Sequence, residues 1–180
     1  NVEVDGVITN EAITNYGQVT LSKDEKALCN VCGISENFVD KMEILDICDK
    51  LGNPTGKTVE REIAHQQGIL HRTAHVWILR KKENKIQILL QKRSEQKDSF
   101  PGCYDISSAG HIPAGDNYGQ SAVRELKEEL GIVVRESELI DCGNRRFHFE
   151  EIFHGRLFKD NQVSKIFVLW KDLEEKDFVF

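Results

Sequence analysis

Residues 110–132 decide the fold, and they read GHIPAGDNYGQSAVRELKEELGI. The second half, from Ser121 to Leu130, is predicted to be a helix, because its apolar residues recur at four-residue spacing and form one stripe. Asn117 suits the N-cap of this helix, and Gly131 suits the position just after its end. The stretch therefore predicts one amphipathic helix that is entered through a loop.

Three carboxylates lie on a narrow arc of this helix. At about 100° per residue, Glu125, Glu128 and Glu129 share a face beside the apolar stripe. Like charges at these spacings repel, and a bound divalent cation removes that penalty; carboxylate oxygen is the ligand that Mg²⁺ prefers. Arg124 precedes Glu128 by one turn, so we expect an ion pair that orients this ligand. The alternative interpretation is an acid-rich helix face exposed to solvent.

The whole stretch resembles the Nudix box, whose pattern is G-x5-E-x7-R-E-U-x-E-E-x-G-U, with U an apolar residue. Eight of its nine defined positions match, and Asp116 stands at the ninth in place of glutamate. The matching residues are Gly110, Arg124, Glu125, Leu126, Glu128, Glu129, Gly131 and Ile132. The resemblance implies an α+β fold, a Nudix-type α/β/α sandwich around a mixed β-sheet. It also implies hydrolysis of a diphosphate linkage with Mg²⁺, for which Mn²⁺ can substitute.

The same resemblance implies roles for individual residues. Arg124 and the three glutamates would form the catalytic set, and the glutamates would hold one or more Mg²⁺ ions. The carbonyl of Gly110 and the side chain of Asp116 would complete the metal shell. The general base is left open, because the box does not fix it in this family; the candidates are Glu128, Glu129, His148, Glu150 and Glu151.

Beyond the box, residues 43–170 resemble the branch that holds the type I isopentenyl-diphosphate isomerases and a neighbouring set of Nudix hydrolases. In the isomerases, the histidines that match His65, His71 and His111 hold a divalent metal, so a second metal site is implied. Each histidine alone is more typical of an ordinary strand or loop residue. Arg93 and Lys97 match the pair that contacts the diphosphate, and the alternative is two solvated cations.

Two departures argue against isomerase chemistry, which needs an acid and a base on opposite faces of an alkene. The isomerase cysteine falls on Ala109, and a methyl group transfers no proton. The isomerase glutamate falls on Gln162, and an amide is neither a useful acid nor a carboxylate ligand. The sequence therefore predicts a hydrolase acting on a nucleoside diphosphate derivative or, second, an isoprenoid diphosphate. The alternatives are an isopentenyl-diphosphate isomerase and a non-catalytic nucleotide-sensing module.

Composition and charge bound these predictions. The chain has 180 residues and a net charge of -6, which argues against nucleic acid or an anionic membrane as the main partner. Its five cysteines are odd in number and irregularly spaced, and no membrane-length apolar run is present, which favours a reduced cytoplasmic setting. The CxxC at Cys29–Cys32 lacks a second ligand pair at zinc-finger spacing and is interpreted as part of a loop.

The domain organisation is predicted as an N-terminal extension, residues 1–40, followed by a Nudix domain over residues 41–180. Residues 1–12 resemble the element that normally closes a Nudix domain, and we expect them to supply it within the same chain or in the partner of a homodimer. Strands are predicted over residues 43–48, 73–80, 86–91 and 104–109, with a hairpin turn at 82–84. A last strand pair is predicted at 146–153 and 163–170, with residues 154–161 between them.

Overall fold

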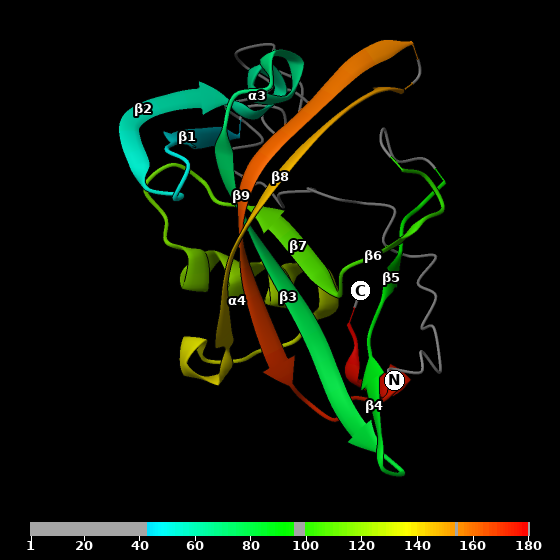
Figure 1. Cartoon of the computed structure of the whole chain (residues 1–180). Helices are drawn as coiled ribbons and strands as arrows, with labels where there is room; N and C mark the ends of the chain where they lie inside the picture. The colour runs from blue at the N-terminus through cyan, green and yellow to red at the C-terminus, as the bar shows by residue number, and fades with distance from the viewer. Residues whose placement is uncertain (1–42, 96–99, 154, 180) are drawn as a thin grey trace, which may run out of the picture.

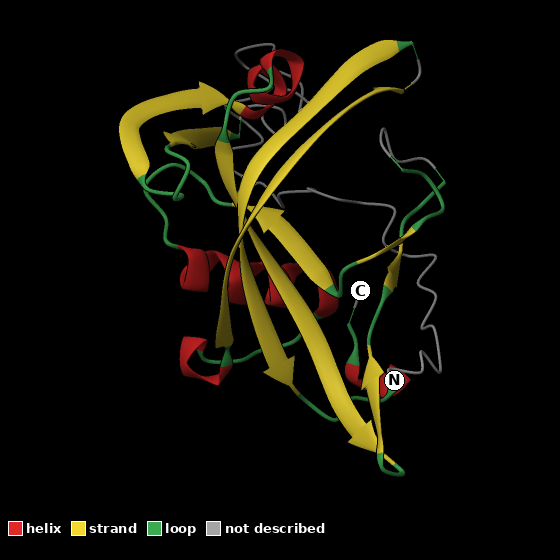
Figure 2. Cartoon of the chain, viewed as in Figure 1, coloured by secondary structure: helices red, strands yellow, loops and turns green. Residues whose placement is uncertain are grey.

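The computed structural model describes residues 43–95, 100–153 and 155–179 of the chain. A mixed five-stranded sheet forms its centre (Figures 1 and 2). The long strand β3 pairs in parallel with β9, and β9 pairs antiparallel with β8. The other edge of β3 is shared by β7 at its start and β4 at its end. The five strands are β3 (His71–Lys82), β4 (Lys85–Ile88), β7 (Ser108–His111), β8 (Ile140–Phe153) and β9 (Arg156–Trp170).

Two small ribbons and four helical segments complete the described part of the chain. The ribbons pair β1 (Ile44–Cys48) with β2 (Pro54–Glu60), and β5 (Gln91–Lys92) with β6 (Tyr104–Asp105). The helices are α3 (Arg61–Gln67) and α4 (Tyr118–Leu130), with 3-10 turns at Glu136–Glu138 and Glu175–Asp177. None of the helices in the described ranges combines the length and the hydropathy that a membrane-spanning helix requires.

The helix α4 ends at Leu130 as its sequence predicts, and it starts at Tyr118, three residues before the predicted Ser121. The side chain of Asn117 accepts a hydrogen bond from the backbone N–H of Gln120 at 2.8 Å, which satisfies one of the open donors of the first turn. Gly131 adopts the left-handed conformation with φ of 69°, and its N–H bonds back to the helix carbonyls. The predicted capping of this helix is therefore confirmed.

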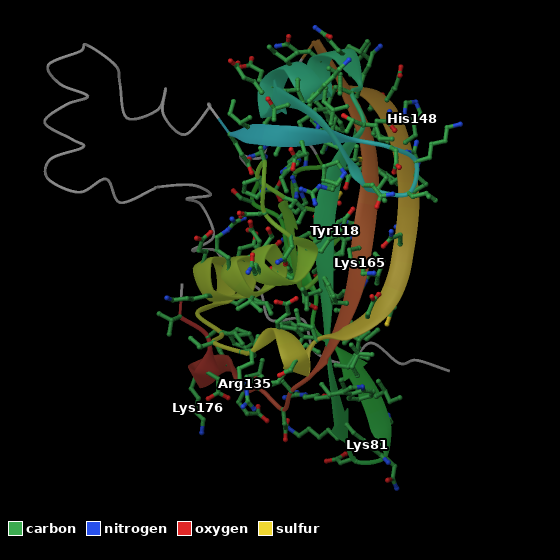
Figure 3. The ribbon with its side chains drawn as sticks, turned by 90° about the vertical axis from the view of Figure 1, so that its left-hand side faces the viewer. Lys81, Tyr118, Arg135, His148, Lys165 and Lys176 are labelled. Carbon is green, nitrogen blue, oxygen red and sulfur yellow. The ribbon has the colours of Figure 1, made fainter. Side chains whose placement is uncertain are left out.

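The hydrophobic core fills the space between α4 and one face of the sheet. Ala74, Val76 and Ile78 of β3 pack with Ala122 and Leu126 of α4, and all five are at most 3% exposed. Successive strand residues face opposite sides, so Thr73 and His75 lie on the other face of β3. Figure 3 shows α4 on one side of the sheet. The predicted α+β class with a mixed sheet is confirmed.

The predicted hairpin is also confirmed, and its turn has the twist that short hairpins favour. Glu83 and Asn84 both have positive φ, 49° and 61°, as a two-residue type I′ turn requires. The predicted strand at 104–109 is instead two strands, β6 and β7. Between them Ser107 is buried; its hydroxyl donates to the carbonyl of Leu89 and accepts from the N–H of Ile78, which replaces regular ladder bonds.

The prediction of a connecting segment over residues 154–161 is wrong. Residues 156–161 continue β9, and β8 pairs with them up to Phe153↔Arg156, so that the two strands form a long ribbon beyond the rest of the sheet (Figure 1). Polar residues of this segment are compatible with a strand because they have partners: the side chain of Asn161 donates to the carbonyl of Gly68 at 2.8 Å. The predicted extension, residues 1–40, and its arm at 1–12 lie outside the described residues.

Candidate functional site

A buried ion pair fixes the loop that leads into α4. Arg72 Nη2 donates to Asp46 Oδ2 at 2.7 Å and to the carbonyl of Asp116 at 3.0 Å. The same oxygen of Asp46 accepts from the backbone N–H of Gly115 at 2.9 Å. Arg72 is 4% exposed and Asp46 is 8% exposed. Strands β1 and β3 thereby hold the backbone of residues 115–116 directly before the glutamate-bearing helix.

Arg124 lies at the centre of the predicted carboxylate site. Its guanidinium bonds Glu125 Oε1 at 3.0 Å and Asp116 Oδ2 at 3.1 Å. The predicted ion pair with Glu128 is present, and at 3.7 Å it is the longest of the three. Arg124 therefore joins three of the carboxylates that the sequence assigned to metal binding.

The three glutamates of α4 differ in burial. Glu129 is buried, and Ser108 Oγ of β7 donates to its Oε2 at 2.7 Å. Burial raises the pKa of Glu125, an effect that the neighbouring Arg124 opposes and the charge of Glu128 reinforces. The side chain of Glu128 is 61% exposed. The set thus presents one buried, one half-buried and one solvent-facing carboxylate along the helix.

Gly110 of β7 lies directly beneath Glu125. A Cβ built on Gly110 would overlap the Cγ, Cδ and Oε1 atoms of the Glu125 side chain. Only a glycine leaves room for the carboxylate to cross the strand at this point. The missing side chain of Gly110, the first residue of the box, therefore provides the space that the side chain of Glu125 occupies.

We expect Gly110→Ala to keep the fold and to lower hydrolase activity, because the flexible Glu125 carboxylate would move aside while the backbone stays. The measurement is hydrolysis rate alongside the urea unfolding midpoint. Gly119→Ala is the matched control: its Cβ would overlap the carboxylate of Glu136, a side chain outside the proposed site. Equal activity in the two variants would argue against a role for the Glu125 position.

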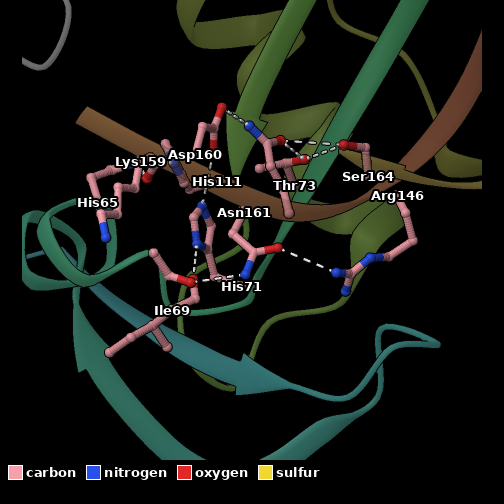
Figure 4. A network of polar contacts seen from close by, with 12 residues as sticks. His65, Ile69, His71, Thr73, His111, Arg146, Lys159, Asp160, Asn161 and Ser164 are labelled. Carbon is pink, nitrogen blue, oxygen red and sulfur yellow. Dashed lines mark hydrogen bonds and ion pairs between the residues drawn. The ribbon is translucent and has the colours of Figure 1, made fainter. Parts of the chain in front are cut away.

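The three histidines of the predicted second site come together. Among the described residues, His65, His71 and His111 are the one group of three or more metal-ligating side chains whose ligand atoms all lie within 4.8 Å of one another. They come from α3, β3 and β7 (Figure 4). His65 Nε2 and His111 Nε2 are 3.1 Å apart. This convergence brings together residues that are up to 46 positions apart in the chain.

Each histidine of the trio has a ring nitrogen within 4.8 Å of a ring nitrogen of the other two. His71 Nδ1 lies 2.8 Å from the carbonyl of Ile69, so Nδ1–H donates and Nε2 carries the lone pair. That Nε2 atom is buried and has no hydrogen-bond partner within the described ranges. Burial lowers the pKa of His65 to about 4, lowers the pKa of His71, and holds that of His111 well below its ordinary value. Neutral imidazoles are the form that binds a metal.

Asp160 of β9 lies beside the histidine trio, and the sequence interpretation missed it. Its Oδ1 lies 3.9 Å from both His65 Nδ1 and His71 Nε2. Burial raises the pKa of Asp160 to about 6. The available signal was the stretch Asp160–Gln162, whose first residue is a carboxylate two positions before the residue that matches the isomerase glutamate.

Arg93 and Lys97 are the residues predicted to contact the diphosphate. Arg93 follows β5 and donates to Asp105 Oδ2 of β6 at 3.0 Å. Lys97 lies outside the described residues. Ala109 pairs with His75 across β7 and β3, so it shares a sheet face with His71, His111 and Gln162. A methyl group and an amide thus stand on the face where isomerase chemistry would need an acid and a base.

Comparisons with known proteins agree with this architecture. The sequence model of the NUDIX domain family matches residues 69–178 of this chain. A Photorhabdus laumondii protein named isopentenyl-diphosphate Delta-isomerase 2 is 38% identical over 135 residues, covering 68% of this chain and 71% of that protein. Nudix hydrolase 3 of Arabidopsis thaliana is 52% identical over 90 residues, covering 50% of this chain and 11% of that protein. The predicted branch near the isomerases is confirmed.

A solved structure supports the same fold. The crystal structure of a Deinococcus radiodurans protein superposes with a TM-score of 0.52 at 19% identity, covering 77% of this chain and 80% of that one. This likeness concerns the fold alone. The chain spans only 11% of the Arabidopsis relative, so the activity of that whole protein is not transferred. Because the domain match extends over residues 69–178, more than half of the 180 residues, the chain belongs to the Nudix family.

Proposed function

We propose that this chain is a Mg²⁺-dependent Nudix hydrolase that cleaves a diphosphate linkage, in a nucleoside diphosphate derivative first and an isoprenoid diphosphate second. The observation that carries the proposal is the cluster in which Arg124 joins Asp116, Glu125 and Glu128 beside Gly110. We further propose that residues 41–180 form the catalytic domain.

The donor set fits a hard divalent cation. Glu125, Glu128, Glu129 and Asp116 offer carboxylate oxygens, and Gly110 offers a carbonyl, which are the ligand types of Mg²⁺ and Mn²⁺. Burial first, and the charge of Glu128 in addition, raise the pKa of Glu125, and a bound cation would favour its charged form. Such a cation, when bound, neutralises charge that develops on the phosphate oxygens.

The protein's own groups would orient the reaction. Ser108 fixes the Glu129 carboxylate from β7, and the Asp46–Arg72 pair fixes the loop before α4. Glu128 is the exposed member of the set and is our choice for accepting the proton of the attacking water. His148 and Glu150 lie 3.5 Å apart on β8, and Figure 3 shows His148 high on the ribbon, away from α4, so they are weaker choices.

The histidine trio with Asp160 fits a second, different metal. Three imidazoles and one carboxylate are typical ligands of a transition metal such as Zn²⁺, Mn²⁺ or Co²⁺ rather than of Mg²⁺. The buried His71 Nε2 and Asp160 Oδ1, which have no hydrogen-bond partner among the described residues, fit such an ion. We propose that this site is separate from the carboxylate site, since His111 and Gly110 are consecutive in β7 and so face opposite sides of the sheet.

Isomerisation of isopentenyl diphosphate is the second candidate function. Its support is the Photorhabdus relative, whose name is that of an isomerase. Against it stand Ala109 and Gln162, which replace the groups that would move the proton.

One assay separates the candidates. The chain is incubated with Mg²⁺, then with Mn²⁺, and a panel of nucleoside and isoprenoid diphosphates, and the products are identified. Release of phosphate or a monophosphate supports the hydrolase. A dimethylallyl product would instead establish the isomerase. Binding without turnover of any compound would overturn both and leave a sensing module.

Arg93→Ala is expected to raise the KM for diphosphates by about 10-fold or more, because a charge-assisted hydrogen bond to an anion is worth about 1.5–3 kcal/mol. Metal affinity, measured by titration, should change little. The KM of Arg93→Lys should lie between that of the unsubstituted chain and that of Arg93→Ala, since lysine keeps the charge but loses the planar fork. Arg135→Ala, at a guanidinium that is 85% exposed, is the control. An unaltered KM in Arg93→Ala would mean that Arg93 does not bind the diphosphate and only pairs with Asp105.

A further inference from the structure

A row of polar side chains crosses the sheet on the face of the histidine trio. Thr73 of β3 and Ser164, Gln162 and Asp160 of β9 share this face, because Thr73 is in register with Ser164 and strand residues alternate. Thr73 is 4% exposed and Ser164 is fully buried. Figure 4 shows Thr73 and Ser164 together, and Asp160 next to the histidines. A buried polar row requires an explanation, since such groups are costly to desolvate.

The hydrogen bonds of Gln162 in this row donate toward Asp160, from the hydroxyls to Gln162 and from Gln162 to the carboxylate. Thr73 Oγ1 donates to Gln162 Oε1 at 2.6 Å, and Ser164 Oγ donates to the same oxygen at 3.2 Å. An amide whose oxygen accepts two hydroxyl protons has its nitrogen pointing the other way. Gln162 Nε2 accordingly donates to Asp160 Oδ2. The two buried hydroxyls therefore fix the orientation of the Gln162 amide, and the amide in turn fixes the orientation of the Asp160 carboxylate.

This orientation leaves the other oxygen of Asp160 directed at the histidines. Asp160 Oδ1 is buried, has no hydrogen-bond partner within the described ranges, and lies 3.9 Å from His71 Nε2. Because Oδ2 is occupied by the amide, Oδ1 is the atom that remains for a cation. A glutamate at position 162 would place a second carboxylate against Asp160 and could not donate to it.

We propose that Gln162 is a positioning residue that holds Asp160 as the single carboxylate ligand of a transition-metal site completed by His65, His71 and His111. This inference rests on the second metal site of the proposed function. It gives Gln162 a role of its own: the amide supports a three-histidine, one-carboxylate site and is not a ligand of it. Partners that orient metal ligands typically affect metal affinity by about 10–100-fold.

The test measures Co²⁺ binding to the full chain by calorimetry and visible absorption in excess Mg²⁺, so that the carboxylate site is saturated. Gln162→Leu is expected to weaken Co²⁺ binding by about 10–100-fold and to alter the absorption band. Thr73→Val should also weaken Co²⁺ binding, because it removes the hydroxyl that donates to Gln162. Thr73→Ser keeps a hydroxyl and should bind Co²⁺ as the unsubstituted chain does. Gln87→Leu is the matched control, because Gln87 accepts from Arg80 at 2.6 Å on β4, away from the histidines. Circular dichroism verifies folding of each variant.

Two results would overturn the inference: one would remove the positioning role of Gln162, and the other would remove the metal site itself. If His71→Ala abolishes Co²⁺ binding while Gln162→Leu and Thr73→Val bind as the unsubstituted chain does, the site stands and the positioning role fails. If His71→Ala binds Co²⁺ as well as the unsubstituted chain, the site itself fails. Neither result concerns Mg²⁺-dependent hydrolysis, which the product assay measures separately.

Discussion

Glutamine in place of Glu129 or Glu128 is expected to reduce Mg²⁺-dependent hydrolysis by about 100-fold or more, because losing one stabilising group in a transition state costs about 10²–10³ in kcat. The fold should remain intact. At position 129 the amide oxygen can still accept from Ser108 Oγ, which now donates to Glu129 Oε2 at 2.7 Å. The change therefore removes charge and leaves the shape of the buried side chain almost unaltered.

The measurement compares kcat and Mg²⁺ affinity in Glu128→Gln and Glu129→Gln with the unsubstituted chain. Glu83→Gln serves as the control, because Glu83 is an exposed carboxylate in the turn between β3 and β4. Raising the Mg²⁺ concentration should recover part of the lost rate if the metal is held less tightly. Unchanged activity in both variants would remove these glutamates from the catalytic role that we propose.

Local signals in the sequence predicted the parts of the fold that depend on neighbouring residues. The apolar stripe, Asn117 and Gly131 together define α4, because a helix and its caps involve residues within a few positions of one another. The turn at Glu83–Asn84 is equally local. These elements were predictable because the determining contacts lie inside the segment itself.

Contacts between distant segments were not predictable from one sequence. The parallel pairing of β3 with β9 joins His71 to Gln162, and no local pattern indicates it. The helix α3, which carries His65, has seven residues and one buried side chain, too few for a clear apolar period. Asp160 was missed for the same reason, since its role appears only when β9 lies beside His71. The family resemblance supplied the histidines, whereas the fourth group required the structure.

The ion pair between Asp46 and Arg72 had no sequence signal at all. The two residues are 26 positions apart, and charged residues in strands usually face solvent. In the structure both are buried, and together they bind the backbone at Gly115 and Asp116. The position of the loop that carries part of the proposed metal shell thus depends on two residues outside the box.

Asp46→Ala is therefore expected to lower the free energy of unfolding by about 3–5 kcal/mol, because it leaves the buried guanidinium of Arg72 without its charged partner. The bond from Arg72 to the carbonyl of Asp116 and its position 5.3 Å from the centre of the Tyr118 ring compensate only in part. Urea denaturation measures the change. Asp46→Ala combined with Arg72→Met should be less destabilised than Asp46→Ala alone, since no unpaired charge remains buried.

The matched control is Glu43→Ala, which breaks the ion pair between Glu43 and Arg61 at 3.1 Å, with side chains 26% and 48% exposed. Solvent screens this pair, so its loss should cost only about 0–1 kcal/mol. If burial sets the value of the Asp46–Arg72 pair, the two single variants must differ by several-fold in their effect on stability. Equal costs would mean that water reaches Arg72 in solution, and the loop before α4 would then need another anchor.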